Sequence, residues 1–217
     1  MSGAENGKIT WGIVTAGKIA RKFCNGVIRS RTGTLAAVAA RDGSRAEAFA
    51  AEFKIPRHHS SYQALIEDPS VTAVYIGTPH PMHARWAIEA ARAGKHVLCE
   101  KPFTMDKTEA EALRRDLAAL SNGTKVMEGF MYQFHPQWEA VFEMVKAGRI
   151  GRVIAVQTWF SYFGDDPNNI RHNPEWGGGA LMDIGCYAIH SARRLFNAEP
   201  ERVRGSLEVH QTYGVDV

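Results

Sequence analysis

Residues 9–28 read ITWGIVTAGKIARKFCNGVI, in which an apolar run passes through a turn of small residues into a segment with helical spacing. Residues 9–14 predict a buried strand, and residues 16–28 predict a helix with one apolar face. A dinucleotide-binding βαβ unit begins with this order of strand, turn and helix. The segment therefore favours an α/β fold whose first turn is a binding site.

The turn between this strand and helix carries a partial dinucleotide fingerprint. Gly17 and Ala20 hold its second and third small positions, while Thr15 replaces its first glycine. Free N–H groups and the helix dipole favour a pyrophosphate at a helix N-terminus. We therefore expect five consecutive residues to bind the cofactor, namely Thr15, Ala16, Gly17, Lys18 and Ile19. A turn with a purely structural role is the alternative.

The alternation of strands and helices continues to about residue 130. Ser44, with Glu47 three residues later, forms a capping box for the second helix. Alternating strands and helices predict βαβ units, and so a parallel sheet covered by helices on both faces. The further strands are expected over residues 34–40, 71–77, 96–100 and 124–128, and the further helices over residues 80–94 and 106–120.

The pattern changes beyond residue 135. A helix is predicted over residues 136–147, followed by a long aromatic strand over residues 152–163. The polar segment 164–179 has the composition of a functional loop. A helix is expected over residues 179–196, and an alternating strand from residue 202 to residue 217.

Composition excludes several classes of protein. The 217 residues contain 26 Lys and Arg against 23 Asp and Glu, and a net charge of +3 is too small to indicate nucleic acid or a membrane surface as partner. The three cysteines are far apart, which favours a reducing compartment over a disulfide framework. Since no apolar segment is long enough to span a membrane, a cytoplasmic protein is expected.

The end of the second strand bears on the choice of cofactor. An NAD site places a carboxylate there to bind the ribose 2′-hydroxyl, but this chain reads Ala40-Arg41-Asp42. The Arg41 guanidinium suits a 2′-phosphate, so NADP is expected in preference to NAD. Two alternatives are an inward-facing Asp42, which would favour NAD, and a solvated Arg41.

Two later segments carry candidate chemistry. Glu100-Lys101-Pro102 follows a parallel strand, at the edge where open α/β sheets bind ligands, although a lysine there is often only a surface charge. In GGGALMDIGCY (177–187), three glycines open a helix on which Asp183 and Tyr187 are spaced i,i+4. They share a face with His190 and Arg194, and a solvated polar face is the alternative.

These motifs resemble the glucose–fructose oxidoreductase/inositol dehydrogenase/MocA (Gfo/Idh/MocA) family of NAD(P)-dependent oxidoreductases. The resemblance covers residues 9–205. Within the family, the chain is most similar to the branch that contains dimeric dihydrodiol dehydrogenase and D-xylose dehydrogenases. The matching segments are WGIVTAGKIA, GTPHPMH, AGKHVLCEKPF, GFMYQFHP and NNIRHNPEWGGGALMDIGCY. The resemblance implies a Rossmann domain over residues 1–130. It also implies an incomplete α+β domain over residues 131–217, since members of the family are longer. The open antiparallel sheet of that domain would serve as substrate platform and oligomer interface.

The resemblance also implies roles for individual residues. Lys101 corresponds to the catalytic lysine, Tyr187 to the proton-transferring tyrosine, and Asp183 to a residue that orients the substrate or the lysine. The cofactor is lined by Glu100 and by the segment that contains Thr78, Pro79, His80 and His83. Asn169 and Arg171 match substrate-pocket positions. For His80 and His83 the alternatives are a helix-start turn and a packing residue, and no metal is expected because no acid or cysteine lies at a suitable spacing.

The implied reaction moves a hydride between nicotinamide and a sugar or related hydroxy or carbonyl compound. A free tyrosine, with a pKa of about 10, is a poor base at pH 7, and a nearby ammonium lowers that pKa. Aldose oxidation is the leading expectation, ahead of ketone reduction and dihydrodiol oxidation. A dinucleotide-binding sensor without turnover is the alternative class of function, and the presence of Lys101 and Tyr187 favours the enzyme.

Overall fold

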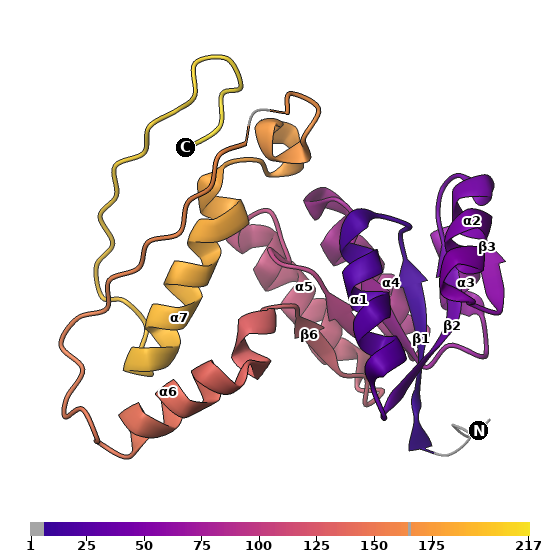
Figure 1. The fold of residues 1–217 in the computed structure, drawn as a ribbon, viewed down its shortest axis with the longest axis horizontal. Coiled ribbons are helices and arrows are strands. Elements are labelled where there is room, and N and C mark those ends of the chain that lie inside the picture. Colours follow the sequence, from indigo (N-terminus) through magenta and orange to yellow (C-terminus); the bar gives the residue numbers. More distant parts are fainter. Residues whose placement is uncertain (1–6, 165) are drawn as a thin grey trace. The chain divides into compact units, whose positions relative to one another are not determined.

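The computed structural model describes residues 7–164 and 166–217. The chain divides into two compact units, Met1–Gly129 and Phe130–Val217. The described part of the first unit contains a six-stranded sheet of order β3-β2-β1-β4-β5-β6, in which every pair of neighbours is parallel (Figure 1). This confirms the predicted α/β fold. The strands are β1 (Ile9–Val14), β2 (Gly33–Ala39), β3 (Arg57–His59), β4 (Ala73–Ile76), β5 (His96–Cys99) and β6 (Val126–Glu128).

Helices cover both faces of this sheet because successive strand residues point to opposite sides. Helices α1 (Lys18–Arg29) and α2 (Gly43–Phe53) pack on the face that carries Ile13, Val38 and Tyr75. Helices α3 (Tyr62–Glu67) and α4 (His83–Arg92) pack on the face that carries Val14, Val74 and Ile76. Helix α5 (Lys107–Leu120) packs against α4 through Leu113 and Ile88. No described helix is both long enough and apolar enough to cross a membrane.

The structure corrects three details of the first unit. The side chain of Asp42 caps α2 by accepting the Ser44 N–H at 2.9 Å, so the predicted Ser44–Glu47 capping box is wrong. Strand β3 and helix α3 were not predicted. Each is only one short segment, and the sequence Arg-His-His of β3 has no apolar run. The predicted helix over residues 80–94 begins instead as a 3₁₀ turn, His80–Met82, before α4.

The second unit contains two α-helices and several short turns in its described residues. Helix α6 (Pro136–Lys146) confirms the prediction for residues 136–147. The predicted helix 179–196 consists of a π-helical turn, Leu181–Gly185, followed by α7 (Cys186–Phe196). The shorter elements are 3₁₀ turns at Met131–Phe134, Ile170–His172 and Pro174–Trp176.

The strands predicted over residues 152–163 and 202–217 are not formed, so the described residues of the second unit hold no sheet. The antiparallel pairing there is a single isolated bridge between Val209 and Asp216. A strand needs a neighbour that takes its backbone N–H and C=O groups. No described segment does this for residues 152–163, and Trp159 and Phe163 remain 84% and 88% exposed.

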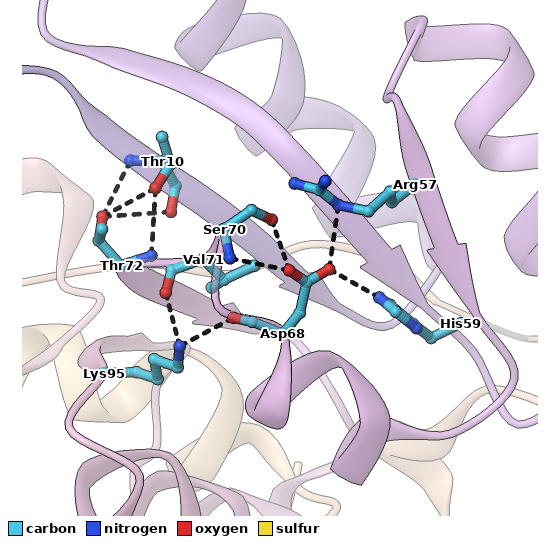
Figure 2. A network of polar contacts seen from close by, with 8 residues as sticks. All are labelled: Thr10, Arg57, His59, Asp68, Ser70, Val71, Thr72 and Lys95. Atoms are coloured by element: carbon cyan, nitrogen blue, oxygen red, sulfur yellow. Dashed lines mark hydrogen bonds and ion pairs between the residues drawn. The ribbon is translucent and has the colours of Figure 1, made fainter. Parts of the chain in front are cut away.

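Polar contacts fasten the amino-terminal ends of the strands in the first unit (Figure 2). Just before β4, Thr72 Oγ1 accepts the Thr10 N–H at 3.0 Å. Just before β5, Lys95 Nζ donates to the carbonyls of Asp68 and Val71 at 2.8 and 2.7 Å. The buried Asp68 carboxylate is the centre of this network, because it contacts Arg57 and His59 of β3 and accepts two hydrogen bonds from Ser70.

Asp68→Asn is expected to lower stability in a pH-dependent way. Burial raises the pKa of Asp68, but hydrogen bonds from Ser70 and His59 and the Arg57 charge outweigh burial and hold it at about 2. An aspartate in an unfolded chain has a pKa of about 3.9. Because the native pKa is lower, the ionised carboxylate stabilises the native state by about 2 kcal/mol at pH values above about 3.9. This contribution falls as the pH drops toward the native pKa.

Urea unfolding at pH 7, 5 and 3 tests this expectation. The difference in free energy of unfolding between the parent and Asp68→Asn should shrink by about half at pH 3. Asp116→Asn is the control, since Asp116 is 55% exposed and its carboxylate lies 3.7 Å from Arg92. A difference that stays constant from pH 7 to pH 3 would show that the Asp68 charge does not stabilise the fold.

Candidate active site

The predicted cofactor residues of the first unit all follow the carboxyl ends of strands. Thr15–Ile19 follow β1, Arg41 follows β2, Thr78–His83 follow β4, and Glu100 and Lys101 follow β5. Because the strands are parallel, these segments lie along one edge of the sheet. Strand β1 pairs with β2 on one side and with β4 on the other. The strands that follow β1 and those that follow β4 therefore extend the sheet in opposite directions. Open α/β sheets bind their ligands at such a switch point.

The turn after β1 has the backbone that a pyrophosphate site requires. Gly17 is the N-cap of α1, and no described side chain caps the N–H groups of its first turn. Thr15 has φ 128°, in the region that favours glycine, and its N–H donates to the Ala39 carbonyl at 3.1 Å. Thr15 therefore adopts the conformation of the glycine that it replaces in the fingerprint. Strained residues of this kind cluster at ligand sites.

Arg41 and Asp42, which follow β2, have different surroundings. Asp42 caps α2, and hydrogen bonds from Ser44 lower its pKa, so its carboxylate is already engaged as a backbone acceptor. Arg41 is exposed beside it. The guanidinium of Arg41 is therefore the group at this position that is available to an anion.

The segment after β4 contains a buried hydroxyl group that makes no hydrogen bond with the described residues. Thr78 is 5% exposed, and its Oγ1 atom has no hydrogen-bond partner among the described residues. An unsatisfied buried polar group costs about 1–3 kcal/mol. A polar ligand at this edge would satisfy it. His83 differs from the expectation of direct contact, because it is 1% exposed and both its ring nitrogens face backbone carbonyls.

The turn after β5 holds Lys101 between anchored neighbours. The Glu100 N–H donates to the Ile76 carbonyl at 2.9 Å, and the Glu100 carboxylate accepts the Tyr75 hydroxyl at 2.7 Å. Burial, and next the Glu100 charge, raise the pKa of Tyr75. Burial also raises the pKa of Glu128, while the hydrogen bond from the Phe103 N–H and then the Lys101 charge act in the opposite direction.

The glycine run of the second unit allows a loop to approach the start of α7 closely. A Cβ atom on Gly178 would lie 2.5 Å from the Arg171 carbonyl oxygen and 2.7 Å from that of Asn173. Gly179 has φ 106°, and its N–H donates to the Arg171 carbonyl at 2.9 Å. These glycines therefore position the loop that carries Arg171 against the helix that carries Asp183.

Asp183 is a buried carboxylate with two strong partners. Its Oδ2 atom lies 2.7 Å from Arg171 Nε and accepts the Tyr162 hydroxyl at 2.5 Å. The hydrogen bond to Asp183 raises the pKa of Arg171, and the Tyr187 phenol adds to this effect. Asn169 Oδ1 accepts the Arg171 N–H at 3.1 Å. Asp183, Arg171, Asn169 and Tyr162 line a cavity of about 490 Å³.

Tyr187 lines a second, mainly aromatic cavity of about 410 Å³. Its ring lies 5.5 Å from that of Phe130, edge to face. The two cavities share the wall residues Thr158, Phe160 and Ala188. The structure therefore brings Tyr187, Asp183 and Arg171 into one region of the second unit.

Of the four residues expected on one polar face, Tyr187 and His190 do lie together, because both contact the rings of Phe130 and Tyr132, whereas Asp183 contacts Tyr162 and Arg171 instead. The π-helical turn contains Asp183 but ends before Tyr187, which shifts the helical phase between them. His190 stacks on Phe130 and lies 2.6 Å from the Tyr132 hydroxyl, while Arg194 lies over the ring of Phe142. The role of Tyr162 was missed, because it belongs to a segment that was predicted as a regular strand.

Comparison with known families agrees with both units. A model described as an oxidoreductase family with an NAD-binding Rossmann fold matches residues 9–130, and a GFO/IDH/MocA C-terminal domain model matches residues 138–217. The chain belongs to the Gfo/Idh/MocA family. This confirms the resemblance drawn from the motifs.

Two curated members of the family are similar over nearly the whole chain. D-xylose 1-dehydrogenase (NADP(+)) 2 of Haloferax volcanii is 41% identical over 95% of this chain and 62% of its own length. Trans-1,2-dihydrobenzene-1,2-diol dehydrogenase of Mus musculus is 38% identical, over 96% of this chain and 62% of its own length. The chain thus spans about 62% of the length of these curated relatives.

Solved structures of the family show the same fold. A Tyr-to-Phe variant of KijD10, a 3-ketoreductase from Actinomadura kijaniata, was solved with TDP-benzene and NADP. It has a TM-score of 0.81 and 32% identity, over 97% of this chain and 64% of its own. The aldose-aldose oxidoreductase of Caulobacter crescentus, solved with glycerol, has a TM-score of 0.81 and 30% identity, over 89% of this chain and 59% of its own.

Proposed function

We propose that this chain belongs to an NADP-dependent oxidoreductase that moves a hydride between nicotinamide and a sugar or a related hydroxy or carbonyl compound. The observation that carries the proposal is the carboxyl edge of the first sheet. There, an α1 N-terminus without a side-chain cap lies one strand away from the exposed Arg41. Two of the chain's relatives, the NADP-dependent D-xylose dehydrogenase and the 3-ketoreductase solved with NADP, support this choice.

The residues at that edge fit a dinucleotide phosphate. The α1 N-terminus would bind the pyrophosphate, and Arg41 would bind the 2′-phosphate. A polar group of the cofactor would give Thr78 Oγ1 the hydrogen bond that it lacks. The remaining contacts of this proposal come from Thr15, Ala16, Lys18, Ile19, Pro79, His80, Glu100 and Lys101. NADP, when bound, supplies the hydride acceptor or donor.

The proton is proposed to move through Tyr187. During alcohol oxidation, the Tyr187 oxygen would take the proton of the substrate hydroxyl, and during reduction it would return it. Lys101 would favour the phenolate form and stabilise an oxyanion on the substrate. The presence of these groups favours an enzyme over a sensor.

The substrate is proposed to be rich in hydroxyl groups. Asp183, Arg171 and Asn169 place a carboxylate, a guanidinium and an amide on one cavity wall, which suits a polyol or an aldose. Aldose oxidation is therefore proposed first. Dihydrodiol oxidation is the second candidate, because the aromatic cavity beside Tyr187 can receive an apolar ring. NADP⁺ reduction with a panel of aldoses and dihydrodiols separates the two.

Arg41→Ala tests the choice of cofactor. The substitution is expected to weaken NADPH binding at least tenfold and to change NADH binding less than twofold, because hydrogen bonds to a charged group contribute about 1.5–3 kcal/mol. Fluorescence titration with each cofactor measures both affinities. Arg29→Ala, at the opposite end of α1, is the control. NADH binding by the parent chain as tight as NADPH binding would contradict the assignment.

A further inference from the structure

His83 connects the ends of two neighbouring strands. It is the first residue of α4, and its side chain is almost wholly buried. Its Nε2 atom lies 2.7 Å from the Thr78 carbonyl oxygen, just after β4, and its Nδ1 atom lies 2.8 Å from the Pro102 carbonyl oxygen, just after β5. The imidazole therefore bridges the segment that carries Thr78 and the segment that carries Lys101.

The chemistry of this bridge is unusual for a buried ring. A neutral imidazole has one N–H group, whereas both nitrogens here face oxygen atoms that can only accept. Turning the ring over would place carbon atoms against the carbonyls, so both contacts require the observed orientation. Burial lowers the pKa of His83, while the two carbonyls and the Glu100 and Glu109 charges act in the opposite direction. At least one nitrogen donates in either protonation state.

The bridge fixes the turn on which Lys101 lies. Before Lys101, the Glu100 N–H is held by the Ile76 carbonyl at 2.9 Å. After Lys101, the Pro102 carbonyl is held by His83, and the Phe103 N–H donates to Glu128 at 2.9 Å. A proline has no N–H group, so at Pro102 the carbonyl is the backbone group through which the turn can be held.

We propose that His83 is a positioning residue that holds Lys101 in register with Thr78 without touching the cofactor. The proposal rests on the proposed catalytic role of Lys101. It replaces the direct cofactor contact that the family resemblance implies for His83. Small displacements of a catalytic group cost about 10²-fold in rate, which sets the scale of the expected effect.

His83→Phe removes both hydrogen bonds and keeps a planar ring. It is expected to lower kcat by about 10–100-fold while the Kd for NADPH stays within about threefold. His83→Gln, whose amide can still donate to one carbonyl, should recover part of the loss. Ile88→Ala is the matched control, because Ile88 is buried on the same helix and lies outside the bridge. It should lower the melting temperature with kcat unchanged.

Two kinetic outcomes would overturn the inference. A Kd for NADPH raised tenfold or more with kcat unchanged would show that His83 contacts the cofactor. The second outcome is a His83→Phe variant whose melting temperature is no higher than that of Ile88→Ala and whose kcat stays within twofold of the parent value. It would show that His83 only packs and does not position Lys101.

A readout that needs no turnover separates this inference from the proposed function. Hydrogen–deuterium exchange of the 217-residue chain without cofactor should accelerate over residues 100–103 in His83→Phe and remain unchanged in Ile88→Ala. Unchanged exchange in both variants would overturn the bridge, whatever the activity. Accelerated exchange in a chain that oxidises none of the tested alcohols would support the bridge and contradict the proposed reaction.

Discussion

Tyr187→Phe is expected to lower turnover by about 10²–10⁴-fold, the usual contribution of a positioned proton donor or acceptor. The affinity for NADPH should stay within about twofold, because the cofactor residues follow the strands of the first unit while Tyr187 belongs to α7 of the second. Steady-state kinetics and fluorescence titration measure the two quantities separately.

The structure makes this substitution a clean one. The Tyr187 ring is half-buried and contacts the rings of Phe130, Tyr132 and Phe160. Phenylalanine preserves these contacts and removes the hydroxyl oxygen alone, so the fold should be retained. Tyr213→Phe is the matched control, since Tyr213 also belongs to the second unit and its ring stacks with those of His172 and His210.

Full activity in Tyr187→Phe would assign the proton to another group. A loss that appears in the Kd for NADPH and leaves kcat unchanged would also contradict the proposed role. A similar loss in Tyr213→Phe would show that the second unit is sensitive to any such change.

The first unit could be predicted because its signals are local. Buried parallel strands are continuous apolar runs, and each is followed by a turn and a helix within a short length of chain. Strand β3 escaped prediction because Arg57–His59 carries no such run and depends on its pairing with β2. The cap of α2 was misassigned because Asp42 and Ser44 are both good N-caps, and only the backbone geometry decides between them.

The second unit shows what a local pattern cannot specify. The alternation of residues 152–163 fits a strand, but a strand exists only with a partner, and the described chain supplies none. Motifs located Lys101, Asp183 and Tyr187 by their place in the sequence. The spacing of Asp183 and Tyr187 assumes a regular α-helix, and no spacing rule predicts the π-helical turn Leu181–Gly185 that the structure has there.

The buried position of Asp183 leads to the second large expected effect. Asp183→Asn leaves the Arg171 guanidinium without a carboxylate and offers the Tyr162 hydroxyl a weaker acceptor. Breaking a fully buried ion pair costs about 3–5 kcal/mol. Because Arg171 is 43% exposed, solvent screens part of this loss, and about 1–3 kcal/mol is expected here.

Asp183→Asn should also lower kcat/KM, by more than the loss in free energy of unfolding alone would cause. The Arg171 side chain would lose the partner that orients it, so the wall of the polar cavity would change where the substrate is proposed to bind. We expect kcat/KM to drop by about 10²-fold or more. Urea unfolding and steady-state kinetics measure the two effects, and Tyr162→Phe, which removes the hydroxyl that donates to Asp183, should give a smaller loss in both.

A double-mutant cycle with Arg171→Met isolates the ion pair. In the double variant Asp183→Asn/Arg171→Met no charge is left without its partner, so its stability should exceed that expected from adding the two single losses. Its activity should not recover, because both groups proposed to bind the substrate are gone. If the stability changes add without coupling, the contact between Asp183 and Arg171 does not stabilise the second unit. The carboxylate would then have to act on the substrate through its own charge.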